Sequence, residues 1–288
     1  MNIKKLTLTS ADFPEDMRHI PDPPQVLYHL GAPLSELLKR PRVTIVGSRR
    51  TSAYGRQVTT KLAGQLAERG IVIVSGLALG IDAVAHQAAL EAGGKAIAVL
   101  PGPLDNIVPA TNRRLAQAIL DQGGALVSEY APGTMPQKQY FIARNRLMAG
   151  LGQVVVITEA AAKSGSLHTA EFALDQGKTV LAVPGNITQT GSAGTNNLLK
   201  TNQAGVVTSY IDVLHALDLE EASVAEVARK GRNPQEQSLL DLLQQGVSDG
   251  EELLQQSKLS ASAFNQTLTM LEISGKIRPL GANQWCLY

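Results

Sequence analysis

Residues 43–76 read VTIVGSRRTSAYGRQVTTKLAGQLAERGIVIVSG, and this stretch decides the fold. Val43–Val46 and Ile71–Ser75 are short runs rich in β-branched, apolar residues. Apolar residues at consecutive rather than alternating positions are typical of strands buried on both faces of a sheet. The amphipathic segment Tyr54–Arg69 between them predicts a helix, and Gly70 suits its left-handed C-cap. The stretch therefore predicts a strand, a crossover helix and a second, parallel strand.

The same alternation of apolar runs and amphipathic segments continues to about Leu217. It predicts a doubly wound α/β domain with a mainly parallel sheet. Further strands are predicted at Ala96–Leu100, Ala125–Ser128, Gln153–Thr158 and Thr179–Val183. Further helices are predicted at Ile81–Ala92, Asn112–Asp121, Phe141–Leu151 and Ser166–Gln176.

Composition and periodicity divide the chain into four parts. Residues 1–42, with several prolines, are expected to form an N-terminal arm that packs on the core domain of residues 43–217. Residues 218–234 are charged and weakly apolar, and are predicted to be a linker. Residues 235–288 predict a small winged-helix domain of three short helices and a hairpin, with Ser260 as the N-cap of the third helix.

The overall composition is that of an ordinary soluble globular protein, with 44% hydrophobic and 18% charged residues among 288. Because the net charge is only +1, any surface for nucleic acid must be a local patch. The single Cys286 excludes an internal disulfide framework and a cysteine-rich zinc site, and no metal-binding motif occurs, so neither metal nor cofactor is expected. No apolar stretch is long enough to span a membrane, and a cytoplasmic location is expected.

Polar, glycine-rich segments follow the predicted strands. Because the carboxyl ends of parallel strands share one edge of a sheet, these segments should meet where doubly wound sheets bind ligands. Gly47 permits close backbone approach there, and Ser48 and Arg49 can hold a phosphate at the start of the next helix. The glycine spacing is that of neither a dinucleotide nor a nucleoside triphosphate loop. The alternative is a basic turn that merely ends a strand.

The stretch from residue 138 to 146 combines an aromatic ring, cations and an amide, and residues 131–158 contain no carboxylate. Single-stranded nucleic acid needs a flat surface on which a base can stack and cations that neutralise its phosphates. The predicted binding residues are Lys138, Phe141, Arg144, Asn145 and Arg146. The alternative is an ordinary helix with Phe141 in the core and both arginines in solvent.

Ser164, Gly165 and Ser166 open another predicted helix, and they are candidates for an amide cradle that holds a phosphate. Two pairs of side chains could supply acid–base catalysis: Asp82 with His86, and His168 with Glu171. No nucleophile elbow accompanies them, so a structural role is favoured. Lys178 and the pair Arg113–Arg114 are expected to add positive charge near the same edge.

Taken together, these segments resemble the DprA/Smf family, the DNA-processing proteins of bacterial natural transformation, over nearly the whole chain from Pro24. The matching motifs are Gly47-Ser48-Arg49, the Ser75–His86 loop, Pro109-x-x-Asn112, Ser128-Glu129-Tyr130, Phe141-x-x-Arg144-Asn145-Arg146, Ser164–Leu167 and Val183-Pro184-Gly185. The resemblance implies an extended Rossmann-like domain that binds single-stranded DNA, protects incoming DNA, forms homodimers and helps to load the RecA recombinase. Many members add a C-terminal winged helix.

Carried over by position, the resemblance assigns phosphate binding to Gly47, Ser48 and Arg49. It assigns backbone and base contacts to Lys138, Phe141, Arg144, Asn145 and Arg146, with Phe141 as the stacking platform. The resulting expectation is a non-catalytic DNA-binding protein. Two alternatives are an enzyme similar to nucleotide-processing phosphoribohydrolases, and a winged-helix regulator that binds duplex DNA. The signature Pro-Gly-Gly-x-Gly-Thr-x-x-Glu of the former is absent.

Overall fold

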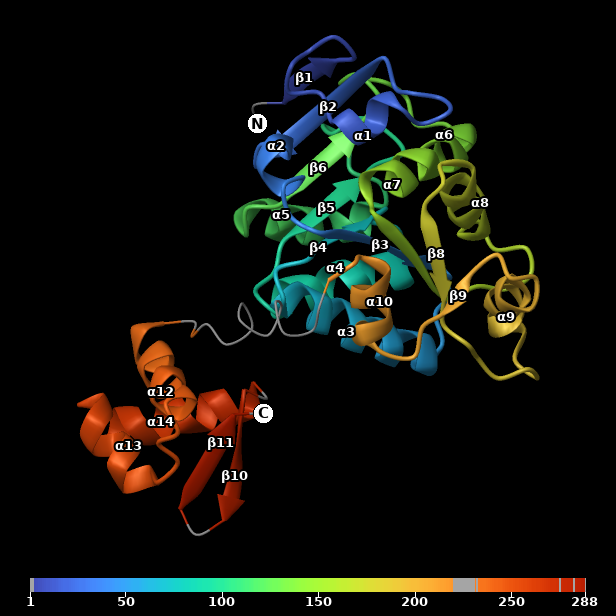
Figure 1. Ribbon diagram of the computed structural model, residues 1–288. Helices are drawn as coiled ribbons and strands as arrows, with labels where there is room; N and C mark the ends of the chain where they lie inside the picture. Colours follow the sequence, from blue (N-terminus) through green and yellow to red (C-terminus); the bar gives the residue numbers. More distant parts are fainter. Residues whose placement is uncertain (1–2, 220–230, 232, 275, 282, 288) are drawn as a thin grey trace. The chain divides into compact units, whose positions relative to one another are not determined.

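The computed structural model describes residues 3–219, 231, 233–274, 276–281 and 283–287 (Figure 1). The chain divides into two compact units, Met1–Glu220 and Glu221–Tyr288. Most of the predicted linker, residues 218–234, lies outside the described residues. Each unit is therefore considered by itself.

The first unit is built on a nine-stranded sheet in the order β1-β2-β6-β5-β4-β3-β7-β8-β9. The strands are β1 (Lys4–Thr7), β2 (Val26–Gly31), β3 (Arg42–Gly47), β4 (Val72–Ser75), β5 (Ala96–Val99), β6 (Ala125–Ser128), β7 (Val154–Glu159), β8 (Thr179–Ala182) and β9 (Gly205–Val206). The sheet is parallel from β6 to β9, whereas β1 and β2 are antiparallel additions. The predicted doubly wound, mainly parallel α/β fold is confirmed.

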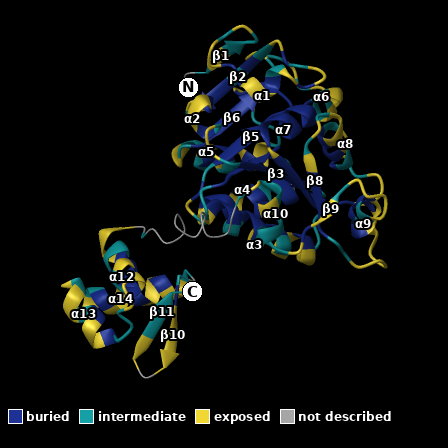
Figure 2. Ribbon diagram, in the orientation of Figure 1, coloured by how far each residue is buried: buried dark blue, intermediate teal, exposed yellow. Residues whose placement is uncertain are grey.

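Helices cover both faces of the sheet and leave its inner strands β3 to β7 buried (Figure 2). One face carries α1 (Glu15–Arg18), α7 (Asn145–Leu151) and α8 (Leu167–Asp175). The other carries α3 (Ala53–Glu68), α4 (Ile81–Glu91) and α5 (Arg113–Asp121). The remaining helices of this unit are α2 (Leu34–Leu37), α6 (Lys138–Ala143), α9 (Ala193–Lys200) and α10 (Tyr210–Ala216), with short 3-10 turns at Ala110–Asn112 and Thr190–Ser192.

Two local differences from the sequence-based expectations affect the candidate site. The N-terminal residues form strands β1 and β2, and not only an arm, because β2 alternates buried and half-exposed side chains against the open edge of β6. The helix expected from Phe141 to Leu151 is divided into α6 and α7 at Arg144, and α6 already begins at Lys138. Lys138 and Phe141 therefore share one short helix.

The strand order changes direction between β3 and β7. From β3 the chain proceeds through β4 and β5 to β6 on one side, and from β7 through β8 to β9 on the other. A crevice therefore opens beyond the carboxyl ends of β3 and β7, which is where open α/β sheets bind ligands. Three predicted segments, the turn at 47–50, the α6–α7 junction and the loop at 163–166, meet at this crevice.

The second unit contains α12 (Pro234–Gln244), α13 (Gly250–Ser257) and α14 (Ala261–Ile273), followed by the antiparallel strands β10 (Ile277–Gly281) and β11 (Gln284–Leu287). Its core is formed by leucines of the three helices, with Phe264 and Ile277. The Ser260 side chain accepts a hydrogen bond from the amide of Ala263 at 3.3 Å, so the predicted N-cap is confirmed. Three helices and a hairpin make the predicted winged helix.

Candidate nucleic-acid interface

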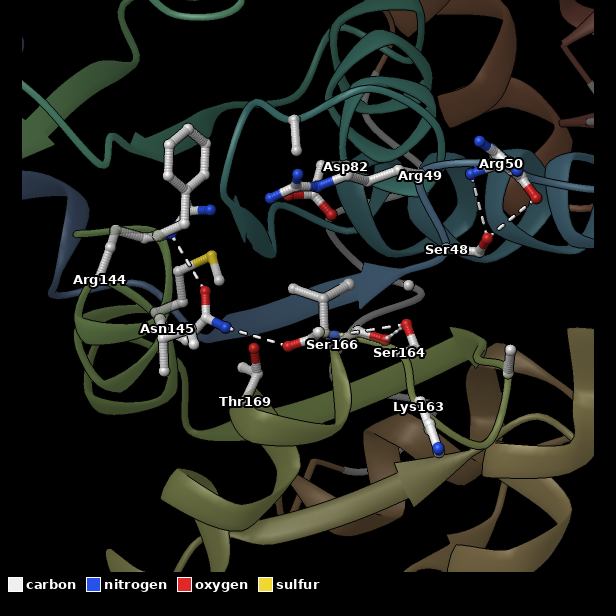
Figure 3. A pocket seen from close by; sticks show the side chains of 18 residues that line it. Ser48, Arg49, Arg50, Asp82, Arg144, Asn145, Lys163, Ser164, Ser166 and Thr169 are labelled. Carbon is white, nitrogen blue, oxygen red and sulfur yellow. Dashed lines mark hydrogen bonds between the residues drawn. The ribbon is translucent and has the colours of Figure 1, made fainter. Parts of the chain in front are cut away.

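A cavity of about 480 Å³ lies at the β3–β7 crevice (Figure 3). The turn after β3 forms one wall and the loop after β7 forms the facing wall, with Arg144 and Asn145 between them. The cavity is lined by Val46–Arg50, Ala78, Asp82, Phe141, Ile142, Arg144, Asn145, Met148, Ala161, Lys163–Ser166 and Thr169.

The turn after β3 is held by its own backbone and by the hydroxyl of Ser48. Ser48 Oγ donates to the carbonyl of Arg50 at 2.9 Å and accepts from the Arg50 amide at 3.1 Å. Gly47 is required here, because a Cβ would lie 2.7 Å from Ile81 Cγ1 and 2.8 Å from the Glu159 carbonyl. Ser48 therefore shapes the turn, and Arg49 and Arg50 project from it as exposed cations.

The N-terminus of α3, which follows this turn, is occupied by the protein's own carboxylate. Glu159, at the end of β7, is 6% exposed. It accepts hydrogen bonds from the Ser52 amide at 3.0 and 3.2 Å and from the Thr51 hydroxyl at 3.0 Å. A negative charge at a helix N-terminus is favourable, and in nucleotide-binding sheets a phosphate takes this place. The arrangement disfavours a pyrophosphate at α3 and fixes the turn that carries Arg49.

Arg49 and Phe141 come together across the mouth of the cavity, although they are 92 positions apart in the chain. The guanidinium carbon of Arg49 lies 5.1 Å from the centre of the Phe141 ring, a cation–π distance. The ring is half-buried, and the guanidinium belongs to an exposed residue. The guanidinium therefore lies over the flat surface of the aromatic ring.

Arg144 is 3% exposed and is an internal support of the site. Its Nη1 donates to the Gly76 carbonyl at 2.7 Å and to the Val99 carbonyl, and its Nε donates to Asn145 Oδ1 at 3.3 Å. Burial lowers the pKa of Arg144 to about 10, so the side chain remains charged at neutral pH. Arg144 joins the loop after β4 and the last residue of β5 to the α6–α7 junction.

The loop after β7 forms a polar wall around Asn145. Asn145 Nδ2 donates to the Gly165 carbonyl at 3.2 Å, and the hydroxyls of Ser164 and Ser166 lie 2.8 Å apart. The buried Thr169 Oγ1 also lines this wall and has no hydrogen-bond partner among the described residues. A ligand that enters the cavity meets hydroxyls and an amide on this side.

The other two predicted cations are placed differently. Lys138, at the start of α6, is exposed one turn before Phe141 but does not line the cavity. Arg146 is 7% exposed and points elsewhere: it pairs with Glu129 at 2.7 Å and with Asp22 at 2.8 Å. Because two carboxylates already match its charge, Arg146 is poorly placed to bind a phosphate.

Asp82 and His86, one of the two candidate acid–base pairs, are both buried, and their contacts indicate a structural role. Asp82 accepts a hydrogen bond from the Gly76 amide at 3.1 Å, and burial raises the pKa of its carboxyl against the opposing effect of Arg144. Burial lowers the pKa of His86 to about 3, so its imidazole is neutral. An imidazole with no solvent exposure is poorly placed for acid–base catalysis.

Besides apolar side chains, the predicted site omitted four polar ones that line the cavity: Arg50, Asp82, Lys163 and Thr169. The two cations adjoin predicted motifs after β3 and β7, and their position behind a strand was the signal that could have identified them. Lys178 is a contrary case, because it directly precedes β8 and therefore lies at the opposite edge of the sheet, near Asp16 and Arg42. The expected charge at the cavity edge does not include Lys178.

A doubly wound sheet whose switch-point cavity is basic, partly aromatic and lined by hydroxyls defines an α/β protein that binds an anionic ligand. The family model for "DNA recombination-mediator protein A" matches residues 4–218, and the model for "DprA winged helix domain" matches residues 222–283. The chain belongs to this family of DNA recombination mediators.

Named relatives agree with this assignment. DNA processing protein DprA of Streptococcus pneumoniae is 45% identical over 202 residues, which cover 70% of each chain. Its counterpart in Bacillus subtilis is 38% identical over 215 residues, which cover 75% of this chain and 71% of that one. Protein Smf of Escherichia coli is 46% identical over 176 residues, which cover 61% of this chain and 47% of that one.

Two solved structures share the fold. The X-ray structure of DprA from Streptococcus pneumoniae has a TM-score of 0.69 at 42% identity and covers 75% of this chain and 74% of that one. The structure that describes the single-stranded DNA binding mode of DNA processing protein A from Helicobacter pylori has a TM-score of 0.68 at 37% identity. It covers 76% of this chain and 98% of that one.

Two properties of the described residues bear on other classes of function. No helix among them combines the length and apolar character that crossing a membrane requires. Within the same part of the chain, no group of three or more His, Cys, Asp or Glu side chains is placed to hold a metal ion.

Proposed function

We propose that this protein binds single-stranded DNA at the β3–β7 cavity and acts there as a recombination mediator during natural transformation. The observation that carries the proposal is the Arg49 guanidinium 5.1 Å from the Phe141 ring at the cavity mouth. An unpaired base offers a face that can stack on Phe141, and its phosphate can bind Arg49. The relative from Helicobacter pylori is described by its mode of binding single-stranded DNA, which supports the same ligand here.

Duplex DNA fits these features less well. Its bases are already stacked on one another, so an aromatic ring in a cavity gains little from them. The supporting features act on any sequence: a ring for the base, cations for the phosphates, and the hydroxyls of Ser164, Ser166 and Thr169 as general hydrogen-bonding groups. We therefore propose that the cavity binds single-stranded DNA of any base sequence.

The test is the affinity for a fluorescent oligothymidine at several salt concentrations. Arg49→Ala and Lys138→Ala should each weaken binding, and each should reduce the logarithmic salt slope by about 0.7 for every phosphate that is no longer neutralised. Arg40→Ala is the matched control, because Arg40 is equally exposed but precedes β3 and so lies at the opposite edge of the sheet. Wild-type affinity and slope in both Arg49→Ala and Lys138→Ala would refute the proposal.

The proposal includes further properties beyond DNA binding. The protein protects incoming DNA and hands it to RecA, which pull-down of RecA in the presence of oligonucleotide tests. It acts as a homodimer, which sedimentation equilibrium tests. It acts in the cytoplasm. It has no catalytic activity, and release of a base from nucleoside monophosphates would contradict this.

A further inference from the structure

A second groove, of about 790 Å³, lies beside the cavity on the face of the sheet that carries α3, α4 and α5. It is lined in part by Arg49 and Arg50, which also line the cavity, so the two hollows meet at the turn after β3. A chain that leaves the cavity past this turn therefore enters the groove without crossing another element.

The groove is basic. Besides the two arginines of the turn, Arg56 of α3 and Arg114 of α5 line it, and both are exposed. Among the described residues, no ion pair or hydrogen bond engages the guanidinium groups of Arg50, Arg56 and Arg114. Glu91 is the only carboxylate among the lining residues, and it already accepts a hydrogen bond from Gln87 at 2.8 Å. Four arginines against one carboxylate give the groove an excess of positive charge, which favours a polyanion there.

The groove has a different chemistry from the cavity. Its lining includes the small and aliphatic side chains of Ala83, Val84, Ala88, Leu115 and Ala118, and the hydroxyls of Thr60 and Thr111. No aromatic ring occurs among its lining residues. The groove can therefore hold phosphates and sugars, whereas base stacking belongs to Phe141 in the cavity.

We infer that this groove is a second DNA subsite, in which Arg50, Arg56 and Arg114 bind the phosphates of nucleotides that flank those held in the cavity. The inference rests on the proposed function, since it extends the same single-stranded ligand. Once the cavity holds one part of the DNA, the neighbouring phosphates are at high local concentration over the groove. Even weak interactions with these phosphates then add to the total affinity for long DNA.

The test compares oligothymidines of about 4 and about 16 nucleotides, which bracket the usual lengths of single-strand sites. The double variant Arg56→Ala/Arg114→Ala should bind the short oligonucleotide like the wild type and the long one more weakly. Removal of each arginine–phosphate interaction should lower affinity by about 4-fold at 0.15 M salt, and the slope for the long oligonucleotide should fall by about 1.4 in total. Lys61→Ala, an exposed cation on α3 outside the groove lining, is the matched control.

The outcomes separate the two proposals. Arg49→Ala should weaken binding of both lengths, and if it weakens neither, the cavity itself is not the DNA site. If Arg49→Ala weakens both while the double variant weakens neither, the groove is not a subsite although the cavity is. An equal loss of affinity for both lengths in the double variant would also overturn the inference, because the groove would then bind the same nucleotides as the cavity. Thermal unfolding of each variant distinguishes these results from loss of folding.

Discussion

Phe141 lines the cavity with an aromatic ring, and the Arg49 guanidinium lies over that ring. Phe141→Ala should cost ~1 to 3 kcal/mol of binding free energy for single-stranded DNA, because a base loses its stacking surface. The salt slope should stay unchanged, since the cations that bind phosphates are still present. Titrations at several salt concentrations measure both quantities.

Phe141→Tyr is the matched variant, because it keeps the ring and should keep most of the affinity. If Phe141→Ala changed the salt slope as Arg49→Ala does, the ring would act by positioning Arg49 and not as a base platform.

His86 makes the stability of the first unit depend on pH. Burial lowers its pKa from 6.5 to about 3, so between these values the unfolded chain binds a proton that the folded protein does not. Stability is therefore present above pH 6.5 and is lost as the pH falls towards 3. His86→Gln should reduce the slope of unfolding free energy against pH by about 1.4 kcal/mol per pH unit between these values.

Urea unfolding of wild type and variant at a series of pH values measures this slope. The raised pKa of Asp82 contributes with the opposite sign, but it is present in both proteins and cancels in their difference. His215→Gln, which removes an exposed imidazole from α10, is the control. An unchanged slope in His86→Gln would show that the imidazole is solvated in the folded protein.

Helix α3 offers a direct test of the role of Glu159, because it contains two glycines with different surroundings. A Cβ on Gly55 would overlap the Glu159 carboxylate, whereas a Cβ on Gly64 would have only the Ala88 carbonyl nearby, at 3.9 Å. Gly55→Ala should cost about 1 to 3 kcal/mol of stability, because the carboxylate must leave its buried hydrogen bonds to Thr51 and Ser52. Gly64→Ala should stabilise the protein by about 0.4 to 1 kcal/mol.

Thermal or chemical unfolding measures the stability of the two variants. Gly55→Ala should also weaken DNA binding, because the displaced carboxylate no longer fixes the turn that carries Arg49. Equal stability of the two variants would contradict the role assigned to Glu159.

At the level of elements, the continuous apolar runs of β3 to β8 identified the buried strands, since few other structures bury every side chain of a short segment. The edge strands β1 and β9, and β2 next to β1, carried no such run, because they are partly exposed. The division between α6 and α7 also left no sequence signal. It lies where Arg144 turns inward to carbonyls 68 and 45 positions away.

Within the candidate site, the rule that ligands bind behind the carboxyl ends of strands located the cavity segments correctly. The sequence did not predict which arginines line the cavity and which form internal ion pairs. Arg146 is matched by Asp22 and Glu129, which are 124 and 17 positions away, and no local pattern announces partners at such separations. The sequence therefore indicated which segments meet, but not which cations remain free once they have met.

At the scale of the whole molecule, the two compact units differ in charge. Residues 221–288 contain six Lys and Arg against eight Asp and Glu, whereas residues 1–220 contain 20 against 17, and α14 contains no Lys or Arg. A helix that enters the groove of duplex DNA normally brings cations for the phosphates as well as groups that contact the bases. We therefore expect the first unit to bind single-stranded DNA by itself.

Deletion of Glu221–Tyr288 should leave the affinity for an oligothymidine within about 2-fold of the full chain, since at most a weak interaction with phosphate is removed. The isolated second unit should show no measurable binding to either single-stranded or duplex DNA at about 0.15 M salt. Fluorescence anisotropy of the three proteins measures both expectations. A tenfold weaker affinity after the deletion would place part of the DNA site in the winged helix.

The carboxylate of Glu159 at the N-terminus of α3 affects which cellular ligands can compete with DNA. Free nucleotides such as ATP and dinucleotide cofactors are abundant, and a doubly wound sheet with an open helix end would attract their phosphates. Here the internal carboxylate occupies that position, so we expect small phosphate-bearing metabolites to compete poorly for the site. A DNA strand that contacts several groups along this edge of the sheet gains affinity from each contact. It can therefore stay bound in the presence of a large excess of free nucleotides.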